Sequence, residues 1–108
     1  MEEIIKGSGN VYADIGVPDA ESMLVKAQLA AAIRKAIAAK ELTQQRAAEI
    51  VGMTQPKLSH MLHGHFRGIS EAKMMACLAR LGRDVKIVVG RNRPRRRTTG
   101  RVSVLQEA

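Results

Sequence analysis

The 108-residue sequence is long enough for one compact domain with tails and too short for a multi-domain enzyme. It has 18 Lys and Arg against 10 Asp and Glu, and the resulting net charge of +8 favours a polyanionic partner such as nucleic acid. No apolar run approaches the ~20 residues of a membrane-spanning helix, and the acidic start, residues 1–3, is unlike a secretory signal. We therefore expect a cytoplasmic protein with no membrane partner.

Charge is distributed unevenly along the chain. Residues 1–21 hold one Lys and five acids, a net charge of −4, whereas residues 22–83 and 84–108 have net charges of +7 and +5. The middle and the C-terminal part would therefore hold any polyanion. We predict an N-terminal arm over 1–18, a helical domain over 19–83, and a C-terminal strand with an Arg-rich tail over 84–108.

The first predicted helix runs from Asp19 to about Lys40. Asp19 is a favourable N-cap, and Glu21 places an anion where the helix dipole attracts one. Apolar residues then recur at helical spacing, which predicts a buried face. The expected core positions are Val25, Leu29, Ala32, Ile33, Ala36 and Ile37.

Three shorter helices are predicted next, over 43–51, 54–63 and 70–81. Thr43, Thr54 and Ser70 are their expected N-caps, because a side-chain oxygen at that position accepts from a free first-turn amide. Gly52 can adopt the left-handed conformation that ends the first of them. Pro56 is tolerated near the start of the second, because the amide that it lacks would have no intrahelical partner.

After Gly82 the apolar period changes from helical to alternating, which predicts a strand over 85–89. A second candidate strand spans 101–105. Between them lies a basic block, 91–97, whose mutual repulsion argues against regular structure in the free chain. A solvated tail and an arm that becomes ordered on DNA are both compatible with this block.

The stretch from Gln44 to His63 indicates the function. Two short helices joined by a tight turn need small residues where they cross, and Ala47 and Ala48 provide them. Gly52 suits the turn. The apolar residues that would lock the second helix across the first are Val51, Met53, Leu58 and Met61. The outer face of that helix then presents the hydrogen-bonding side chains of Thr54, Gln55, Lys57, Ser59 and His60.

Residues 42–59, LTQQRAAEIVGMTQPKLS, resemble the helix-turn-helix of the Cro/Xre phage-repressor family. The resemblance covers roughly residues 22–83 and implies a DNA-binding regulator that is usually dimeric on DNA. The expected fold is mainly α, a lambda-repressor-like helix-turn-helix bundle, to which the alternating pattern adds a C-terminal β-strand segment. The second helix of the motif would lie in the major groove.

Carried onto the matching positions, the resemblance places Gln44 against a DNA phosphate and Gln55 and His60 over base edges. Pro56 stands where many relatives have a polar base-reading side chain, so an apolar contact to a thymine methyl is expected there. The full set of expected DNA-binding residues is Gln44, Thr54, Gln55, Lys57, Ser59, His60, His63 and Arg67.

The chemistry of these residues agrees with that assignment. A Gln amide can pair bidentately with adenine, which suits Gln55 to base reading. Lys57 and Arg67 can neutralise phosphates at the edge of the groove.

A narrower resemblance extends to residues 9–21, GNVYADIGVPDAE. Together with the helix-turn-helix and a Val-rich strand with a basic tail, this segment is similar to HigA-type antitoxins. Those relatives are small bacterial proteins that bind a ribonuclease toxin and repress their own operon. The acidic arm is the part of this chain suited to such a basic partner.

The predicted strand also suggests a homodimer. Val85, Ile87, Val88 and Val89 would expose an apolar edge if nothing covered them, and pairing across a two-fold axis would cover it. Two recognition helices would then lie one DNA turn apart, ~34 Å, and the operator should be an inverted repeat.

Other readings of the sequence are weaker. His60, His63 and His65 lack the further ligands that a zinc site needs, and Cys77 lies on the apolar stripe of the last helix, so no metal or cofactor is expected. No nucleophile has an evident base, so we do not expect an enzyme. Three hypotheses remain: a DNA-binding repressor, stand-alone or with a toxin partner; a protein-binding antitoxin; and an RNA-binding protein that uses the Arg-rich tail, which the scarcity of aromatic residues disfavours.

Overall fold

The computed structural model describes residues 19–92 and 99–107. Its helices are α2 (Ala20–Ala39), α3 (Gln44–Val51), α4 (Gln55–Leu62) and α5 (Glu71–Arg80). The mainly helical fold is thus confirmed for the described residues, with each helix within one or two residues of its predicted bounds. The predicted N-terminal arm, 1–18, and the arginines at 93–97 lie outside the described residues.

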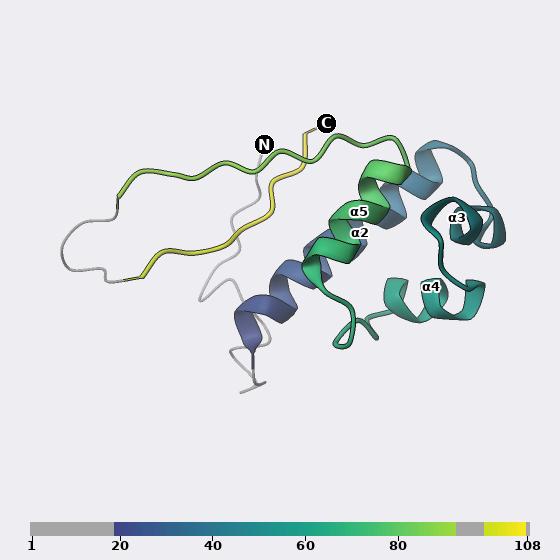
Figure 1. Cartoon of the computed structure of the whole chain (residues 1–108), viewed down its shortest axis with the longest axis horizontal. Coiled ribbons are helices and arrows are strands. Elements are labelled where there is room, and N and C mark those ends of the chain that lie inside the picture. Colours follow the sequence, from purple (N-terminus) through teal and green to yellow (C-terminus); the bar gives the residue numbers. More distant parts are fainter. Residues whose placement is uncertain (1–18, 93–98, 108) are drawn as a thin grey trace.

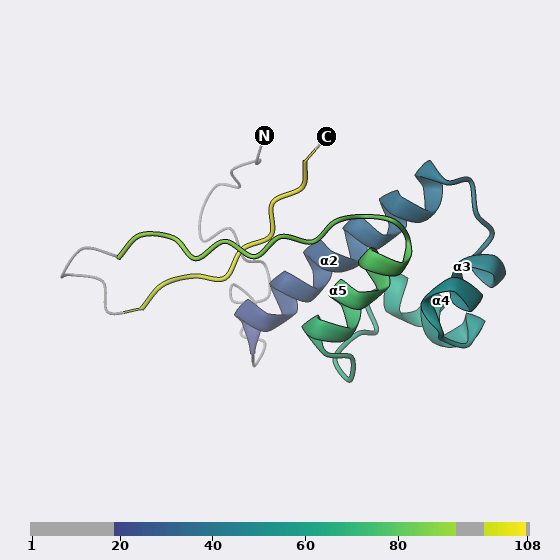
Figure 2. The same ribbon diagram turned by 45° about the horizontal axis from the view of Figure 1, so that its top comes forward.

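The long helix α2 is the platform of the fold (Figure 1). It packs along α5 on one side and against α4, while α3 packs on α4 and α5. All six of its predicted core positions are buried, and Ile33 is fully covered. The helix-turn-helix pair therefore sits at one end of a scaffold made by α2 and α5 (Figures 1 and 2).

The N-caps of the three shorter helices are confirmed. Thr43 Oγ1 accepts from Arg46 N at 3.1 Å, and Ser70 Oγ accepts from Lys73 N at 3.0 Å. Thr54 Oγ1 accepts from Lys57 N at 3.3 Å. Each bond satisfies one of the amides that a helix leaves unpaired in its first turn.

Asp19 was expected to cap α2 with its side chain, and this expectation is wrong. The residue has a left-handed backbone, φ 57°, and makes no side-chain cap hydrogen bond. A capping side chain requires an extended backbone at the N-cap, as at the three caps above, and the left-handed turn at Asp19 removes that geometry.

The predicted C-terminal strands are also wrong. Residues 83–92 and 99–107 are extended but make no backbone-to-backbone hydrogen bonds with each other, so neither is a β-strand. The return segment is instead tied to the start of α2, where Val102 N donates to the Glu21 carboxylate at 3.0 Å. Val104 is partly buried against the core. The alternating apolar pattern predicts an extended backbone. A β-ladder also needs a partner strand in the correct register.

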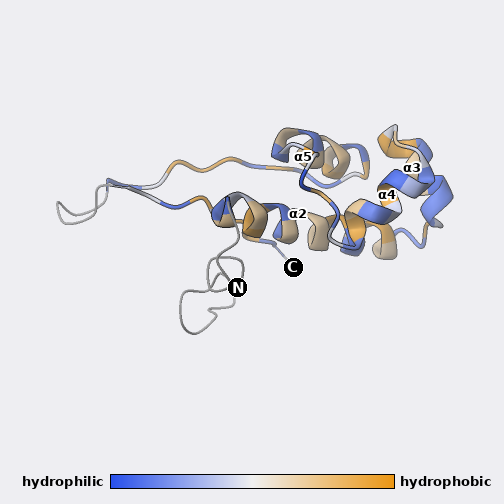
Figure 3. Ribbon diagram, turned by 90° about the horizontal axis from the view of Figure 1, so that it is seen from below, coloured by the Kyte–Doolittle hydropathy of each residue, from blue (hydrophilic) through white to orange (hydrophobic). Residues whose placement is uncertain are grey.

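The two extended segments leave the helices and return with their apolar side chains uncovered. Ile87, Val88 and Val89 are 78%, 86% and 91% exposed, and Val85 is 39% exposed. Figure 3 shows hydrophobic and hydrophilic stretches along these segments, which project away from the helical body. Their contacts with each other are made by side chains: Lys86 pairs with Glu107 at 3.8 Å, and Arg83 donates to the Glu107 carbonyl at 3.4 Å.

Cys77 lies in the core as predicted, with 1% of its surface exposed. Burial raises the pKa of the thiol, although Lys73 and Arg80 oppose that effect. At neutral pH the side chain therefore acts as a small apolar group in α5.

No helix in the described part of the chain is long and apolar enough to cross a membrane.

Gly52 gives a direct test of the turn between α3 and α4. Its φ of +78° is unfavourable for an L side chain, and an added Cβ would lie 3.3 Å from Arg80 Nη1. We predict that Gly52→Ala lowers the free energy of unfolding by about 1–2 kcal/mol in a urea titration. Gly68→Ala is the matched control, because Gly68 has no positive φ and open space around its Cα. An equal loss in both variants would contradict the role of the left-handed turn.

Candidate nucleic-acid interface

The candidate interface is built on α3 and α4, which residues 52–54 join. The turn works because Gly52 takes the left-handed conformation, and its amide donates to Ala48 O at 2.9 Å. Ala47 and Ala48 are buried, which allows the two short helices to approach closely. Leu58 and Met61 are fully buried and hold α4 against the rest of the bundle. The apolar face of α4 is thereby fixed inward and its polar face is left outward.

The predicted DNA-binding residues lie on the surface of this end of the molecule. The structure leaves six of them exposed, namely Thr54, Gln55, Lys57, His60, His63 and Arg67. Gln44 and Ser59 are half-buried. Pro56 is also exposed in the first turn of α4, where a missing amide costs no helical hydrogen bond. Figure 3 shows hydrophilic residues along the outer side of α4.

Gln44 and Gln55 are bonded to each other, which the sequence analysis did not anticipate. Gln55 Nε2 donates to Gln44 Oε1 at 3.1 Å and joins the first residue of α3 to the first residue of α4. This bond uses one of the two N–H groups of Gln55 and leaves its oxygen and the second N–H available. Gln55 is therefore oriented by Gln44 while it retains the donor and acceptor that adenine recognition needs.

Three histidines follow on α4 and the loop after it. His63 Nδ1 lies 2.6 Å from Ser59 O, and because a carbonyl only accepts, Nδ1 carries the proton. The rings of His60 and His65 have their centroids 5.6 Å apart. Within the described residues, no three His, Cys, Asp or Glu side chains come together as a possible metal site. These histidines therefore offer hydrogen-bonding groups to the interface.

The loop that carries Arg67 is held in place by a lysine that the sequence analysis missed. Lys26 is only 7% exposed, and its Nζ donates to Arg67 O at 3.0 Å. It interrupts the apolar spacing of α2, and nothing in that spacing distinguishes it from a surface lysine. The bond leaves the Arg67 side chain exposed beside α4.

Glu71 adds a second tie between α2 and the start of α5. Ser22 Oγ donates to Glu71 Oε2 at 2.7 Å. This bond is the main reason that the pKa of Glu71 is lowered, with the residue's own backbone amide and the Lys26 ammonium acting in the same direction. Glu71 is therefore ionised at neutral pH and provides a negative charge near the buried Lys26.

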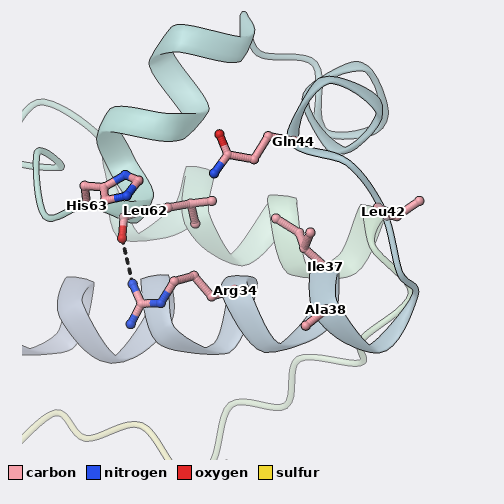
Figure 4. Close-up of a pocket in the computed structure, with 7 residues that line it drawn as sticks. All are labelled: Arg34, Ile37, Ala38, Leu42, Gln44, Leu62 and His63. Atoms are coloured by element: carbon pink, nitrogen blue, oxygen red, sulfur yellow. Dashed lines mark hydrogen bonds between the residues drawn. The ribbon is translucent and has the colours of Figure 1, made fainter.

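Arg34 is the other residue that sequence reasoning missed. Its Nη1 donates to Leu62 O at 2.7 Å, at the C-terminal end of α4. A guanidinium at this end of a helix interacts favourably with the unpaired carbonyls of the last turn. Arg34 thus connects α2 to the end of α4, as the dashed line in Figure 4 shows.

An open surface hollow of about 340 Å³ lies beside this bond, between α2, the start of α3 and the end of α4. We call it the interhelical pocket. Its described lining residues are Arg34, Ile37, Ala38, Leu42, Gln44, Leu62 and His63 (Figure 4). The pocket therefore shares Gln44 and His63 with the predicted DNA-binding set.

Comparisons with known proteins agree with this geometry. A helix-turn-helix domain family matches residues 11–90, which is most of the chain. A solved structure provisionally named an XRE-family transcriptional regulator is similar, with 38% sequence identity and a TM-score of 0.73 over 83% of this chain and 100% of that one. No curated protein matches the sequence.

The family match spans all four described helices, including the α3–α4 pair whose outer face is polar. The chain therefore belongs to the XRE family of helix-turn-helix, DNA-binding transcriptional regulators.

Proposed function

We propose that this protein is a repressor that binds a specific double-stranded operator through α4. The observation that carries the proposal is the outward polar face of α4. It is exposed because the turn at Gly52 and the buried apolar face of α4 fix this helix against the bundle. An α-helix fits the major groove of B-DNA, where each base pair presents a distinct pattern of donors and acceptors.

Gln55 is the proposed reader of an adenine. Its Oε1 accepts from the adenine N6 amino group and its second N–H donates to N7, while the bond to Gln44 restricts its rotamers. Gln44 itself lies at the start of α3, where the first amides have no intrahelical partners and favour a phosphate. The two glutamines thus couple a contact with the DNA phosphate backbone to a contact with a base.

The remaining residues divide by chemistry. Lys57 and Arg67 neutralise phosphates, and the Thr54 hydroxyl donates to one while its oxygen caps α4. His60 and Ser59 reach base edges, and His63 donates or accepts through Nε2 because Nδ1 is held by Ser59 O. Phosphate contacts position α4, whereas base contacts supply the specificity.

The extended segments support a homodimer. Val85, Ile87, Val88 and Val89 are exposed together, and their backbone groups are unpaired within the described residues. A second copy can cover the apolar side chains, and its backbone can form hydrogen bonds with the free amides and carbonyls of the first copy. Strands then form between copies rather than within one. The two copies would then read an operator with two-fold symmetry.

DNA binding can be tested by selecting sites from a genomic fragment library in a mobility-shift assay. We expect inverted repeats whose half-sites lie one DNA turn apart, ~34 Å. We also expect affinity to fall steeply with salt, by ~0.9 log unit per phosphate contact for each tenfold rise. Failure to enrich any fragment at low salt would contradict the repressor, and enriched sites without two-fold symmetry would contradict the dimer.

A double-mutant cycle tests the Gln44–Gln55 bond on the selected operator. We expect Gln44→Ala and Gln55→Ala to relax discrimination at the same base pair, each by ~1–3 kcal/mol. Their effects should be non-additive by ~0.5–3 kcal/mol, because removing either residue breaks the same bond.

Two controls complete the cycle. Gln45→Ala alters the exposed neighbour of Gln44 and should leave discrimination unchanged. Lys57→Ala should weaken all sequences uniformly, more than Lys73→Ala on α5 does. Additive effects of the two glutamines at different base pairs would show that the bond has no role in base reading.

We further propose that the protein is the antitoxin of a small basic ribonuclease and represses the operon that encodes both. Residues 1–21 have a net charge of −4 and the rest of the chain +12, so the arm is the segment with charge complementary to a protein that must grip RNA. The resemblance of residues 9–21 to HigA-type antitoxins supports the same partner.

Deletion of residues 1–18 separates this role from DNA binding. Because α2 begins at Ala20, the truncated chain should still bind the operator. We expect it to fail to rescue cells that express the ribonuclease encoded beside it, whereas the full chain rescues them. Equal rescue by both chains would exclude the arm as the toxin site.

A further inference from the structure

The interhelical pocket has features of a small-molecule binding site, although it shares Gln44 and His63 with the proposed DNA contacts. Its volume of about 340 Å³ falls in the range of small-molecule sites, ~300–1,000 Å³. One wall is apolar and is formed by Ile37, Leu42 and Leu62. Leu42 is partly buried and Leu62 is buried, so this wall belongs to the packed core and does not depend on mobile surface side chains.

Two side chains at the pocket, Arg34 and Gln44, present free donors. Arg34 uses Nη1 for Leu62 O, which leaves the other N–H groups of its guanidinium without a partner among the described residues. The Gln44 oxygen is occupied by Gln55, so its amide nitrogen is the atom left to bind. His63 holds its Nδ1 proton on Ser59 O, so Nε2 of the neutral ring is an acceptor and is not one of these donors. No acidic residue is among the described residues that line the pocket.

We propose that the interhelical pocket binds a small organic carboxylate with a short apolar body. The carboxylate lies against the Arg34 guanidinium, which matches its planar geometry, and accepts from the Gln44 amide. The apolar body covers the wall formed by Ile37, Leu42 and Leu62. A neutral or cationic molecule of the same shape lacks the group that these donors recognise.

Such a ligand would regulate DNA binding, and this part of the inference rests on the proposed function. Gln44 serves both sites, because it orients Gln55 and lies at the proposed phosphate contact of α3. A carboxylate that takes the Gln44 amide competes with the operator for it. By linkage, the operator must weaken ligand binding by the same factor.

The binding step can be tested on the free full-length protein by NMR, with hexanoate as the probe. We expect saturable shifts at the backbone amides of Leu42, Gln44 and His63, and smaller shifts from hexan-1-ol and hexylammonium. Sodium chloride at the same concentration controls for screening. No saturable shift, or equal shifts from hexan-1-ol or from chloride, would overturn the proposal.

Two pairs of variants localise the site. Arg34→Gln removes the proposed carboxylate partner, and Lys35→Gln makes the same charge change at the next exposed position of α2. Ala38→Leu narrows the pocket, and Ala39→Leu adds the same group at an exposed position that does not line it. We expect loss of hexanoate binding in the first member of each pair only. Retained binding in a folded Ala38→Leu protein would overturn the site even if Arg34→Gln fails to fold.

Regulation is tested separately on the selected operator. Saturating hexanoate should weaken operator binding by about 5-fold or more in the wild-type chain and not in Ala38→Leu. An unchanged operator affinity would overturn the regulatory role. The NMR measurement uses no DNA, so failure of the ligand site and failure of the DNA-binding function give different results.

Discussion

The rest of the structure depends on the burial of one face of α2. Nine of its twenty residues are buried, and small side chains such as Ala30 and Ala36 let α4 and α5 approach it closely. The short helices α3 and α4 have only eight residues each, too few to be stable alone in water. Their orientation is therefore a consequence of packing on α2 and α5, and the polar face of α4 is outward because its apolar face has that platform to cover.

The local parts of this fold could be predicted from the sequence. The caps at Thr43, Thr54 and Ser70 and the left-handed turn at Gly52 follow from interactions within a few residues, which sequence patterns describe well. The errors concern geometry that depends on the rest of the chain. Alternation at 85–89 indicates an extended backbone, but a strand requires a partner at the correct register, and the Glu21 carboxylate binds the return segment instead.

In the candidate interface, the exposure of single residues could be predicted from the sequence, whereas the contacts between its helices could not. The exposure of Gln55, Lys57 and His60 follows from helical period once the apolar face of α4 is assigned. The Gln44–Gln55 bond and the Arg34 contact to Leu62 O join residues 11 and 28 positions apart. The apolar period of a single helix does not predict such pairs, because they depend on the angle at which separate helices cross.

The reactivity of the Cys77 thiol can report the opening of the helical bundle. It is the single cysteine in the sequence, it lies in the core of α5, and its raised pKa keeps it as the unreactive thiol. A thiol reagent can reach it only when α5 separates from the bundle. Its modification rate under native conditions therefore measures how often the scaffold beneath the helix-turn-helix comes apart, without any added label.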